Sequence, residues 1–376
     1  MSAVAAPKEA LPTTYTRAVI TAPNTVVMEK DVPLPEVGRG QVLVRMRASA
    51  LCTWEQRTYA GIDTYSYPLV GGHENSGVVV AIGPGVEVKV QEGDQVSLSG
   101  LKRCGQCYSC RRGVWNLCDN QRASRQPNTP WGPGGFGDYV LAEAYQVYKV
   151  GPVAGPLEAA LSEPTACVIH DMKRFPVRNG DVVVIVGAGI MGLLHLLFAR
   201  RTPSFIIVSE PEAARREKAK ELGADAFIDP STEDYVARVK ELSGGNGANV
   251  TYMAIGVPKA IEQAVQASAK RGVVSCYASV HPRGTPITVD PNIFHDKEVV
   301  LSGSISQEPD DFLAAADVIG QRSLDLRPVI SKVFPLSKLE DAFASAARKD
   351  TYRVLVQPDA EYAAGHGREG TPAARA

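Results

Sequence analysis

The sequence predicts an α/β protein with two domains: an antiparallel, barrel-like β domain and a doubly wound domain built on a parallel sheet. The chain has 376 residues, and this length favours two domains over one. Its first half contains short β-branched runs bounded by Gly and Pro, which are typical of an all-β fold. From about Asp181 onward, strand candidates alternate with helical stretches, which indicates a parallel sheet.

Each part is predicted from its own set of apolar runs. Those of the β domain are Gln41–Met46, Gly77–Ile82, Gln95–Leu98 and Tyr139–Ala142. Those of the parallel sheet are Val182–Val186, Phe205–Val208, Ala226–Ile228, Val250–Met253, Val273–Tyr277 and Val299–Leu301. Helical stretches such as Ala213–Leu222 and Lys259–Ala269 separate the second set.

The change of pattern divides the chain. We expect residues 15–165 and 307–357 to form the β domain, because after Gln307 the chain is predicted helical and then ends in the strand-like run Tyr352–Val356. Residues 166–306 are expected to form the parallel-sheet domain. Residues 1–14 and the Ala-, Gly- and Arg-rich residues 358–376 are predicted to be disordered.

Composition excludes several classes of function. A balance of 40 Lys and Arg against 41 Asp and Glu gives a formal net charge of -1, so the chain offers no basic field for nucleic acid. The N-terminus lacks a secretory pattern, and Cys residues without such a signal indicate a reducing, cytoplasmic location. The apolar run Val182–Ala199 is long enough for a membrane span, but its glycines and His195 favour a buried strand, turn and helix.

A glycine motif predicts a dinucleotide site. Gly187, Gly189 and Gly192 follow a strand and open a helix, with Ile190 and Met191 between the last two glycines. The first glycine permits a tight turn, the second lets the backbone approach a pyrophosphate, and the third lets the helix pack on the strand. The motif alone is weak, but its flanking strand and helix strengthen it.

Glu210, which ends the next predicted strand, bears on the choice of nucleotide. A carboxylate there accepts hydrogen bonds from both ribose hydroxyls and repels a 2′-phosphate, which favours NAD over NADP. Arg215 and Arg216 follow closely and could still admit a phosphate. Cofactor binding is therefore a firmer prediction than cofactor choice.

Four closely spaced cysteines predict a structural metal site. Their spacing lets one loop wrap a tetrahedral zinc ion, and four thiolates leave no position for a substrate. Two disulfides are the alternative, but they conflict with a reducing compartment. The four residues are Cys104, Cys107, Cys110 and Cys118.

A second, dispersed set of candidate metal ligands consists of Cys52, His73 and Glu163. Ligands of types S, N and O would leave the fourth position of a zinc ion open for an alcohol oxygen. Each residue alone has an ordinary structural explanation, because a single Cys is usually buried packing and a single Glu is usually a solvated charge. Only the three residues taken together therefore indicate a metal site.

That arrangement resembles a known family. The run GHENSGVVVAIGPGV, the cysteine quartet and the glycine motif resemble, in kind and in order, those of the medium-chain zinc dehydrogenase/reductase family over residues 15–357. The region of Glu163 and Pro164 is most similar to the sorbitol, polyol and threonine dehydrogenase branch. The resemblance implies a GroES-like catalytic domain, a Rossmann domain that binds NAD, two zinc ions per chain, and a homodimer or homotetramer.

The resemblance also implies roles around the catalytic metal. Cys52, His73 and Glu163 match the ligands, and Glu74 is an alternative or exchanging ligand. Glu55 matches an acid that orients the ligand His. The implied reaction takes a hydride from a secondary alcohol, a small polyol or sugar alcohol, to NAD and leaves a ketone.

One position departs from the family pattern. The family usually has a Ser or Thr two residues after the Cys ligand, where it begins a proton relay, and this chain has Trp54. An indole N–H donates a hydrogen bond but does not accept one. Either Trp54 walls the pocket while water or a substrate hydroxyl carries the proton, or Thr53 shifts to the metal, or the enzyme performs another nicotinamide-linked reduction.

Two other functions therefore stay open: a biosynthetic reductase of an imine or activated double bond, and a nicotinamide-binding protein without turnover. The retained trio of candidate ligands argues against the second. Cys167 could replace Glu163 as a ligand, but a buried thiol on the same helix is the simpler interpretation. His170 and His195 are interpreted as packing residues.

Overall fold

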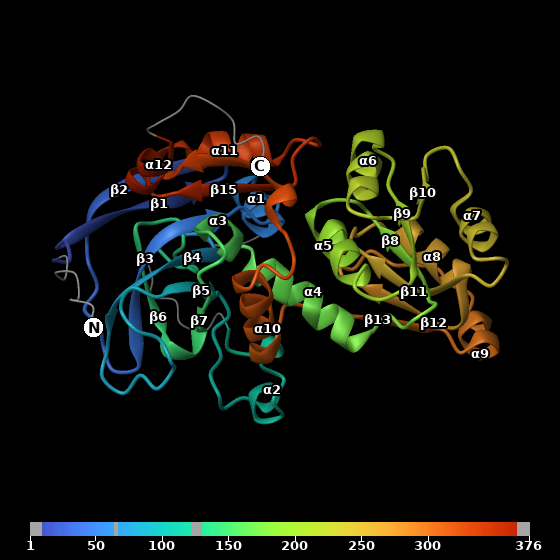
Figure 1. Cartoon of the computed structure of the whole chain (residues 1–376), viewed down its shortest axis with the longest axis horizontal. Coiled ribbons are helices and arrows are strands. Elements are labelled where there is room, and N and C mark those ends of the chain that lie inside the picture. Colours follow the sequence, from blue (N-terminus) through green and yellow to red (C-terminus); the bar gives the residue numbers. More distant parts are fainter. Residues whose placement is uncertain (1–9, 64–66, 122–129, 367–376) are drawn as a thin grey trace.

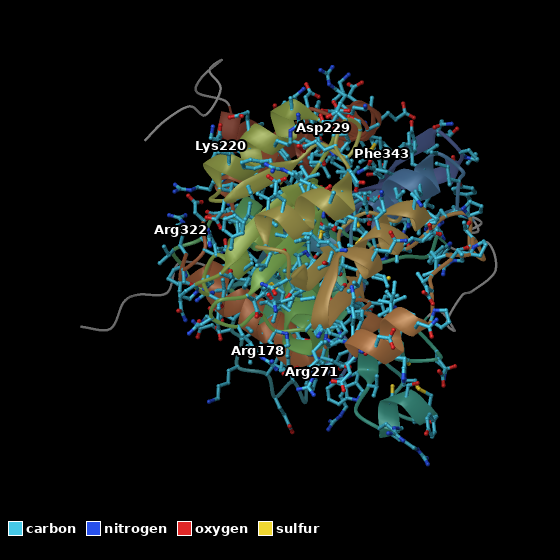
Figure 2. All side chains as sticks on the ribbon, turned by 90° about the vertical axis from the view of Figure 1, so that its right-hand side faces the viewer. Arg178, Lys220, Asp229, Arg271, Arg322 and Phe343 are labelled. Atoms are coloured by element: carbon cyan, nitrogen blue, oxygen red, sulfur yellow. The ribbon has the colours of Figure 1, made fainter. Side chains whose placement is uncertain are left out.

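The computed structural model describes residues 10–63, 67–121 and 130–366, which form two parts joined side by side (Figure 1). The part with the blue and cyan strands holds the N-terminal half and the last, red elements; the yellow-green to orange part holds the parallel sheet. Figure 2 turns the second part toward the viewer and shows charged side chains of both signs, among them Lys220, Asp229 and Arg271. This spread of charge agrees with the near-neutral composition.

The first part is built on a seven-stranded sheet in the order β14-β15-β3-β4-β5-β7, with β6 also paired to β3. The pairs are antiparallel except β14 with β15, which are parallel because the helix α11 (Leu339–Ala346) carries the chain back between them. The prediction of an antiparallel β domain is therefore wrong for this one pair. The strands are β3 (Gln41–Ala50), β4 (Glu74–Ile82), β5 (Gln95–Ser99), β6 (Tyr139–Glu143), β7 (Val147–Lys149), β14 (Ile330–Pro335) and β15 (Arg353–Gln357).

A two-stranded antiparallel hairpin, which the sequence analysis did not predict, lies beside this sheet. Its strands are β1 (Thr14–Ala22) and β2 (Thr25–Pro33), joined by a turn in which Asn24 has a φ of 56°. Asparagine tolerates this left-handed conformation better than most residues do. Ile20 of β1 is fully buried, and its N–H donates to the carbonyl of Leu69 at 2.8 Å, which ties the hairpin to the domain core.

The second part is a six-stranded parallel sheet in the order β10-β9-β8-β11-β12-β13, as the sequence predicts. The strands are nearly continuous apolar runs, because helices cover both faces of such a sheet. The strands are β8 (Val182–Val186), β9 (Phe205–Ser209), β10 (Ala226–Ile228), β11 (Ala248–Met253), β12 (Ser268–Cys276) and β13 (Val300–Gly303). Between them run α5 (Ile190–Ala199), α6 (Ala213–Glu221), α7 (Tyr235–Leu242), α8 (Pro258–Ala267) and α9 (Asn292–Lys297).

The strand order reverses between β8 and β11, which are neighbours in the sheet although β9 and β10 separate them in sequence. In open sheets of this kind, ligands bind outside the carboxyl ends of the strands at the point of reversal. The glycine motif follows β8 directly. The fold therefore places the motif where a dinucleotide is expected.

The helix α4 (Ser162–Arg174) lies between the two parts (Figure 1). It packs on β4 and β5 of the first sheet, on α5 of the second part, and on α10 (Pro309–Gly320). The expected domain boundary at residues 165 and 166 falls inside this helix. The first turn of α4 thereby brings Glu163 to the junction of the two parts.

The C-terminal segment differs from its prediction of disorder, because residues Asp359–His366 form the helix α12. Two tertiary contacts hold this helix: Arg47 Nε lies 2.6 Å from Glu361 Oε1, and the N–H of Ser337 donates to Asp359 Oδ1 at 2.9 Å. Composition alone does not reveal such contacts. Residues 1–9 and 367–376, also predicted to be disordered, lie outside the described residues.

Within the described ranges, no helix is both long and apolar enough to cross a membrane. The apolar run Val182–Ala199 is divided into β8, a glycine turn and α5. His195 lies fully buried within α5. The run is thus a buried strand, turn and helix, as the sequence analysis favours.

Candidate active site

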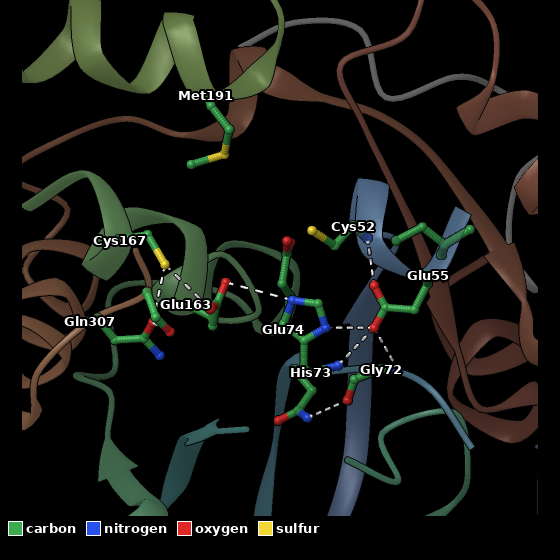
Figure 3. Close-up of polar contacts among 12 residues, drawn as sticks. Cys52, Glu55, Gly72, His73, Glu74, Glu163, Cys167, Met191 and Gln307 are labelled. Atoms are coloured by element: carbon green, nitrogen blue, oxygen red, sulfur yellow. Dashed lines mark hydrogen bonds and ion pairs between the residues drawn. The ribbon is translucent and has the colours of Figure 1, made fainter. Parts of the chain in front are cut away.

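Three separate segments bring the dispersed candidate ligands together (Figure 3). Cys52 follows β3 and caps the helix α1 (Thr53–Tyr59), His73 directly precedes β4, and Glu163 lies in the first turn of α4. Donor atoms of Cys52, Glu55 and His73 lie within 4.8 Å of one another, and so do those of His73, Glu74 and Glu163. His73 is common to both groups, so a sulfur donor and carboxylate donors both lie close to its imidazole.

The donor set fits a zinc ion with an open position. Zinc accepts Cys sulfur at about 2.3 Å and His nitrogen or carboxylate oxygen at about 2.0–2.2 Å, so ligands of one ion lie a few ångströms apart. The separations in both groups are of this order. Three such donors leave one of four tetrahedral positions for a further oxygen.

Glu55 fixes the orientation of the His73 ring. Its Oε1 accepts a hydrogen bond from Nδ1 of His73 at 2.6 Å, and the N–H of Gly72 donates to the same oxygen at 3.0 Å. Its Oε2 accepts from the N–H of Cys52 at 3.2 Å. With a proton on Nδ1, the neutral ring can offer the lone pair of Nε2 to a metal, and Nε2 lies 4.0 Å from Oε2 of Glu163.

Glu74 is held by an arginine that the sequence analysis missed. Arg353 of β15 places Nη2 2.8 Å from Oε1 of Glu74, and both side chains are almost fully buried. Its Nη1 also donates to the carbonyl of Leu51 at 2.9 Å. Burial raises the pKa of Glu74 to about 7, although the charge of Arg353 works in the opposite direction. The sequence contains one indication of Arg353: a charged residue at the start of the apolar run that forms β15, where a charge is buried only with a partner.

Trp54 forms a wall beside His73. The two rings meet edge to face with centroids 5.6 Å apart, and Trp131 packs against Trp54 in the same way at 6.4 Å. Thr53, the first residue of α1, is exposed. The positions of Trp54 and Thr53 agree with the interpretation in which Trp54 walls the pocket.

A cavity of about 600 Å³ opens beside these residues. This volume suits a sugar-sized molecule. His73 and Glu163 lie at its surface, so a bound substrate has access to the candidate ligands. The remaining lining residues are Trp54, Asn75, Leu98, Ser99, Gly100, Leu101, Lys102, Gln121, Pro130, Trp131, Gly132, Pro133, Val140, Leu141, Ala142, Gln146 and Ser306.

The glycine motif has the geometry that its sequence predicts. Gly187 has a φ of 98°, which favours glycine, and a Cβ at Gly192 would lie 1.8 Å from the carbonyl oxygen of Gly187. Gly189 caps the N-terminus of α5, whose first residues are Ile190 and Met191. A Cβ at Gly189 would meet nothing closer than Nη1 of Arg215, at 3.9 Å, so the space beside it is open.

Glu210 lies directly under this turn. Its Oε2 accepts the N–H of Ala188 at 2.8 Å, and its Oε1 accepts the N–H of Glu212 at 3.1 Å. Of the two nearby arginines, Arg216 donates to the carbonyl of Glu210 at 2.6 Å, whereas Arg215 donates to the carbonyl of Lys349 in the other part of the molecule at 2.9 Å. Both arginines thus have partners within the protein.

Comparisons with known proteins agree with this geometry. Residues 38–152 match the model of the alcohol dehydrogenase GroES-like domain, and residues 190–321 match the model of the zinc-binding dehydrogenase. The chain is 33% identical to L-threonine 3-dehydrogenase of Pyrococcus horikoshii, over 88% of this chain and 94% of that protein. The chain belongs to the zinc-dependent medium-chain dehydrogenase/reductase family.

Other members of the family extend the comparison. Sorbitol dehydrogenase of Halalkalibacterium halodurans is 29% identical over 88% of this chain and 95% of that protein. A Sinorhizobium meliloti structure with NADP bound has a TM-score of 0.84 and 27% identity, and the match covers 92% of this chain and 100% of that one. The chain is therefore an oxidoreductase with a GroES-like domain and a Rossmann domain, as the resemblance implied.

In this dehydrogenase the cysteine quartet gathers at one point. The sulfur atoms of Cys104, Cys107, Cys110 and Cys118 lie within 4.8 Å of one another, and none forms a disulfide. The side chain of Asn120 and the N–H groups of Gln106 and Cys107 lower the pKa of Cys104 to about 6 by donating hydrogen bonds to its sulfur. Thiolates are the form that binds zinc, so the loop fits a closed four-sulfur site.

The remaining candidates of the dehydrogenase have partners within the protein. Cys167 donates to Oε1 of Gln307 at 3.0 Å, and its sulfur lies 3.4 Å from Oε1 of Glu163. Nδ1 of His170 lies 2.7 Å from Asp311, and Nε2 of His195 lies 3.1 Å from Asp171. These interactions support the interpretation of all three as packing residues.

Proposed function

We propose that the enzyme oxidises a secondary alcohol, a small polyol or sugar alcohol, to a ketone and transfers the hydride to NAD. The observation that carries this proposal is that Cys52 and Glu163 each cluster with His73, and that His73 and Glu163 line a sugar-sized cavity. L-threonine and sorbitol, which appear in the names of two relatives, both contain a secondary hydroxyl. A chain without turnover has no use for an open metal site at such a cavity.

In this proposal Cys52, His73 and Glu163 hold the catalytic zinc, and Glu74 is an alternative or exchanging ligand. The cysteine quartet holds a second, structural zinc. Bound at these positions, zinc supplies a Lewis acid that stabilises an alkoxide, and NAD supplies the hydride acceptor. Glu55 keeps the lone pair of His73 Nε2 directed at the metal position.

The remaining residues orient the reactants and exclude water. Trp54 and Trp131 form an apolar wall, which limits the directions from which water reaches the substrate carbon. Because Trp54 cannot accept a proton, the proton of the alcohol leaves through water or through a neighbouring hydroxyl of the substrate. A polyol provides such a hydroxyl, which favours polyols over simple alcohols.

The glycine turn holds the pyrophosphate of the cofactor, and Glu210 binds its ribose. The buried carboxylate of Glu210 beside the turn favours NAD over NADP, because a 2′-phosphate would meet its negative charge. We expect Glu210→Ala to lower the ratio of kcat/KM for NAD to that for NADP roughly tenfold or more. An unchanged ratio would mean that Glu210 does not contact the ribose, and Glu217→Ala on the exposed side of α6 is the control.

We also propose a cytoplasmic homodimer or homotetramer. The described cysteines are free thiols, which suits a reducing compartment. The outer strand β13 ends the parallel sheet, and Val300 on it is 46% exposed, so a second copy can pair there. Light scattering of the purified protein gives its mass directly, and a monomer over the working concentration range would contradict this part of the proposal.

A substrate panel tests the central part. Zinc-loaded protein is assayed with NAD against secondary alcohols, polyols and amino alcohols, next to the variants Cys52→Ala and Cys276→Ala. We expect a polyol to be oxidised, with turnover lost in Cys52→Ala and kept in Cys276→Ala, which lies outside both metal groups. NAD binding should survive in both variants.

Two other outcomes identify the alternatives. Reduction of imines or activated double bonds without oxidation of any alcohol identifies a biosynthetic reductase. Tight NAD binding without turnover of any alcohol or carbonyl compound identifies a non-catalytic protein. Full activity in Cys52→Ala would remove Cys52 from the catalytic centre.

A further inference from the structure

Among the described residues that line the cavity, Lys102 carries the one ammonium group and Glu163 the one carboxylate. Glu163 is a proposed metal ligand, so Lys102 provides the remaining charge among the described lining residues. Its side chain is exposed, and no carboxylate of the described residues forms an ion pair with it. The positive charge is therefore free to meet a ligand.

The backbone around Lys102 is held close to His73. A Cβ on Gly100 would lie 2.8 Å from Cβ of His73, so the chain passes against the His73 side chain two residues before Lys102. Two residues span at most about 7 Å. The Lys102 backbone therefore lies within about 7 Å of Gly100, and Lys102 lines the same cavity as His73.

The residues on both sides of Lys102 are fixed. Gln146 donates through Nε2 to the carbonyls of Ser99, at 2.8 Å, and Leu101, at 3.4 Å, while the N–H of Arg103 donates to the hydroxyl of Tyr145 at 3.3 Å. A preorganised backbone lowers the entropic cost of binding through the side chain it carries.

Arg103 takes no part in the cavity. Its guanidinium lies over the ring of Trp115, 3.8 Å from the centroid, and 4.6 Å from the ring centroid of Tyr145. Lys102 lines the cavity, whereas Arg103 does not. The pair Lys102 and Arg103 therefore directs one cation into the cavity and holds the other in an aromatic slot.

We propose that the substrate is an anionic secondary alcohol, whose carboxylate or phosphate group binds Lys102 while its hydroxyl lies at the candidate metal position. This inference rests on the proposed function and names its substrate class. The anionic group is unchanged in the reaction; the carbinol carbon loses a hydride to NAD, and its hydroxyl loses a proton. A neutral polyol leaves the Lys102 charge without a partner.

The test compares neutral and anionic substrates that share a carbon skeleton. Zinc-loaded full chain is assayed with NAD on sorbitol against gluconate, which share a carbon skeleton, and on arabitol against arabitol phosphate. We expect kcat/KM to favour the anionic member of at least one pair, and that pair identifies carboxylate or phosphate as the group recognised. Lys102→Met should reduce this preference roughly tenfold, and Lys102→Arg should retain most of it.

The control is Lys89→Met, which removes an exposed lysine of the same domain outside the cavity and should leave the preference unchanged. The inference would be overturned if the wild type preferred the neutral members, or if Lys102→Met kept the same preference for the anionic member as the wild type. Binding is measured separately through the fluorescence of Trp54 and Trp131, both of which line the cavity. Anion binding that depends on Lys102 without turnover of any alcohol would contradict the proposed function and would leave only an anion site at Lys102. Oxidation of neutral polyols without Lys102 dependence would support the proposed function and overturn the inference.

Discussion

Glu55 is completely buried, yet its two oxygens accept hydrogen bonds from the His73 ring and from the backbone of Cys52, Gly72 and His73. These donors belong to both segments that carry the S and N ligands of the proposed zinc. The Glu55 carboxylate therefore fixes the position of Cys52, which precedes α1, relative to His73, which precedes β4. In the proposed site, Glu55 would act on the metal through the side chains that it orients.

We expect Glu55→Gln to weaken zinc binding at the catalytic site roughly 10- to 100-fold, because a neutral amide with one acceptor oxygen replaces a carboxylate that accepts at both. Competition with a chelator measures this affinity, and zinc in the cysteine quartet serves as the internal reference. Glu87→Gln, on an exposed loop of the same domain, is the matched control. Equal zinc affinity in wild type and Glu55→Gln would show that Glu55 does not position His73.

The buried pair of Arg353 and Glu74 leads to a prediction about stability. Removal of one partner leaves an uncompensated charge in the interior, so we expect Arg353→Met to lower the free energy of unfolding by about 3–5 kcal/mol. The double variant Arg353→Met/Glu74→Gln removes both charges and should recover part of this loss. Urea unfolding measures the wild type, the single variants Arg353→Met and Glu74→Gln, and the double variant; additive losses in the double variant would mean that the pair does not act as a unit.

The sequence predicts these residues unevenly. Cys52, His73 and Glu163 could be found because their residue types are the ones that zinc prefers and because their order resembles a known pattern. Arg353 could not be found, because its contact with Glu74 exists only after β15 pairs with β3, which itself pairs with β4. Lys102 was equally hidden, since a single lysine on a loop gives no pattern.

At the scale of elements, the link between β8 and α5 depends on glycine at two positions for different reasons. A Cβ at Gly192 would collide with the backbone of Gly187, whereas a Cβ at Gly189 would enter open space. The first position serves the fold and the second leaves room for a ligand. Substitution by alanine at each position can therefore separate the structural role of Gly192 from the ligand-binding role of Gly189.

We expect Gly192→Ala to destabilise the Rossmann domain, because helix and strand must move apart. Gly189→Ala should keep the melting temperature but weaken NAD binding roughly tenfold or more, because its methyl group occupies the approach to the pyrophosphate. Thermal unfolding and NADH fluorescence titration provide the two measurements. Unimpaired NAD binding in Gly189→Ala would place the pyrophosphate elsewhere.

Elements with strong periodicity were predictable, and those stabilised by distant contacts were not. The buried strand β8 is an unbroken apolar run, so both its type and its position follow from the sequence. The helix α12 has a composition typical of a disordered tail, and it is held by contacts with distant residues, Arg47 with Glu361 and Ser337 with Asp359. The parallel pairing of β14 with β15 likewise depends on the path of α11, which local sequence does not specify.

At the scale of the whole molecule, the catalytic function requires both parts. The proposed zinc ligands come from the first part and from α4 at the junction, while the glycine turn belongs to the second. Two contacts join the parts near the cofactor turn. Nζ of Lys349 in the first part lies 2.5 Å from Oε1 of Glu212 in the second. Nη2 of Arg353 lies 3.9 Å from the sulfur of Met191 on α5. These contacts set the position of the cofactor turn relative to the metal site.

The proposed catalytic function depends on a metal bound by a sulfur, an imidazole and a carboxylate from three distant segments. Diffraction from crystals of the full chain on both sides of the zinc absorption edge tests this most directly. We predict two anomalous peaks per chain, one among the four cysteines and one in contact with Cys52, His73 and a carboxylate of Glu163 or Glu74. A peak at the cysteine quartet alone, in crystals of protein that oxidises its substrate, would contradict the account.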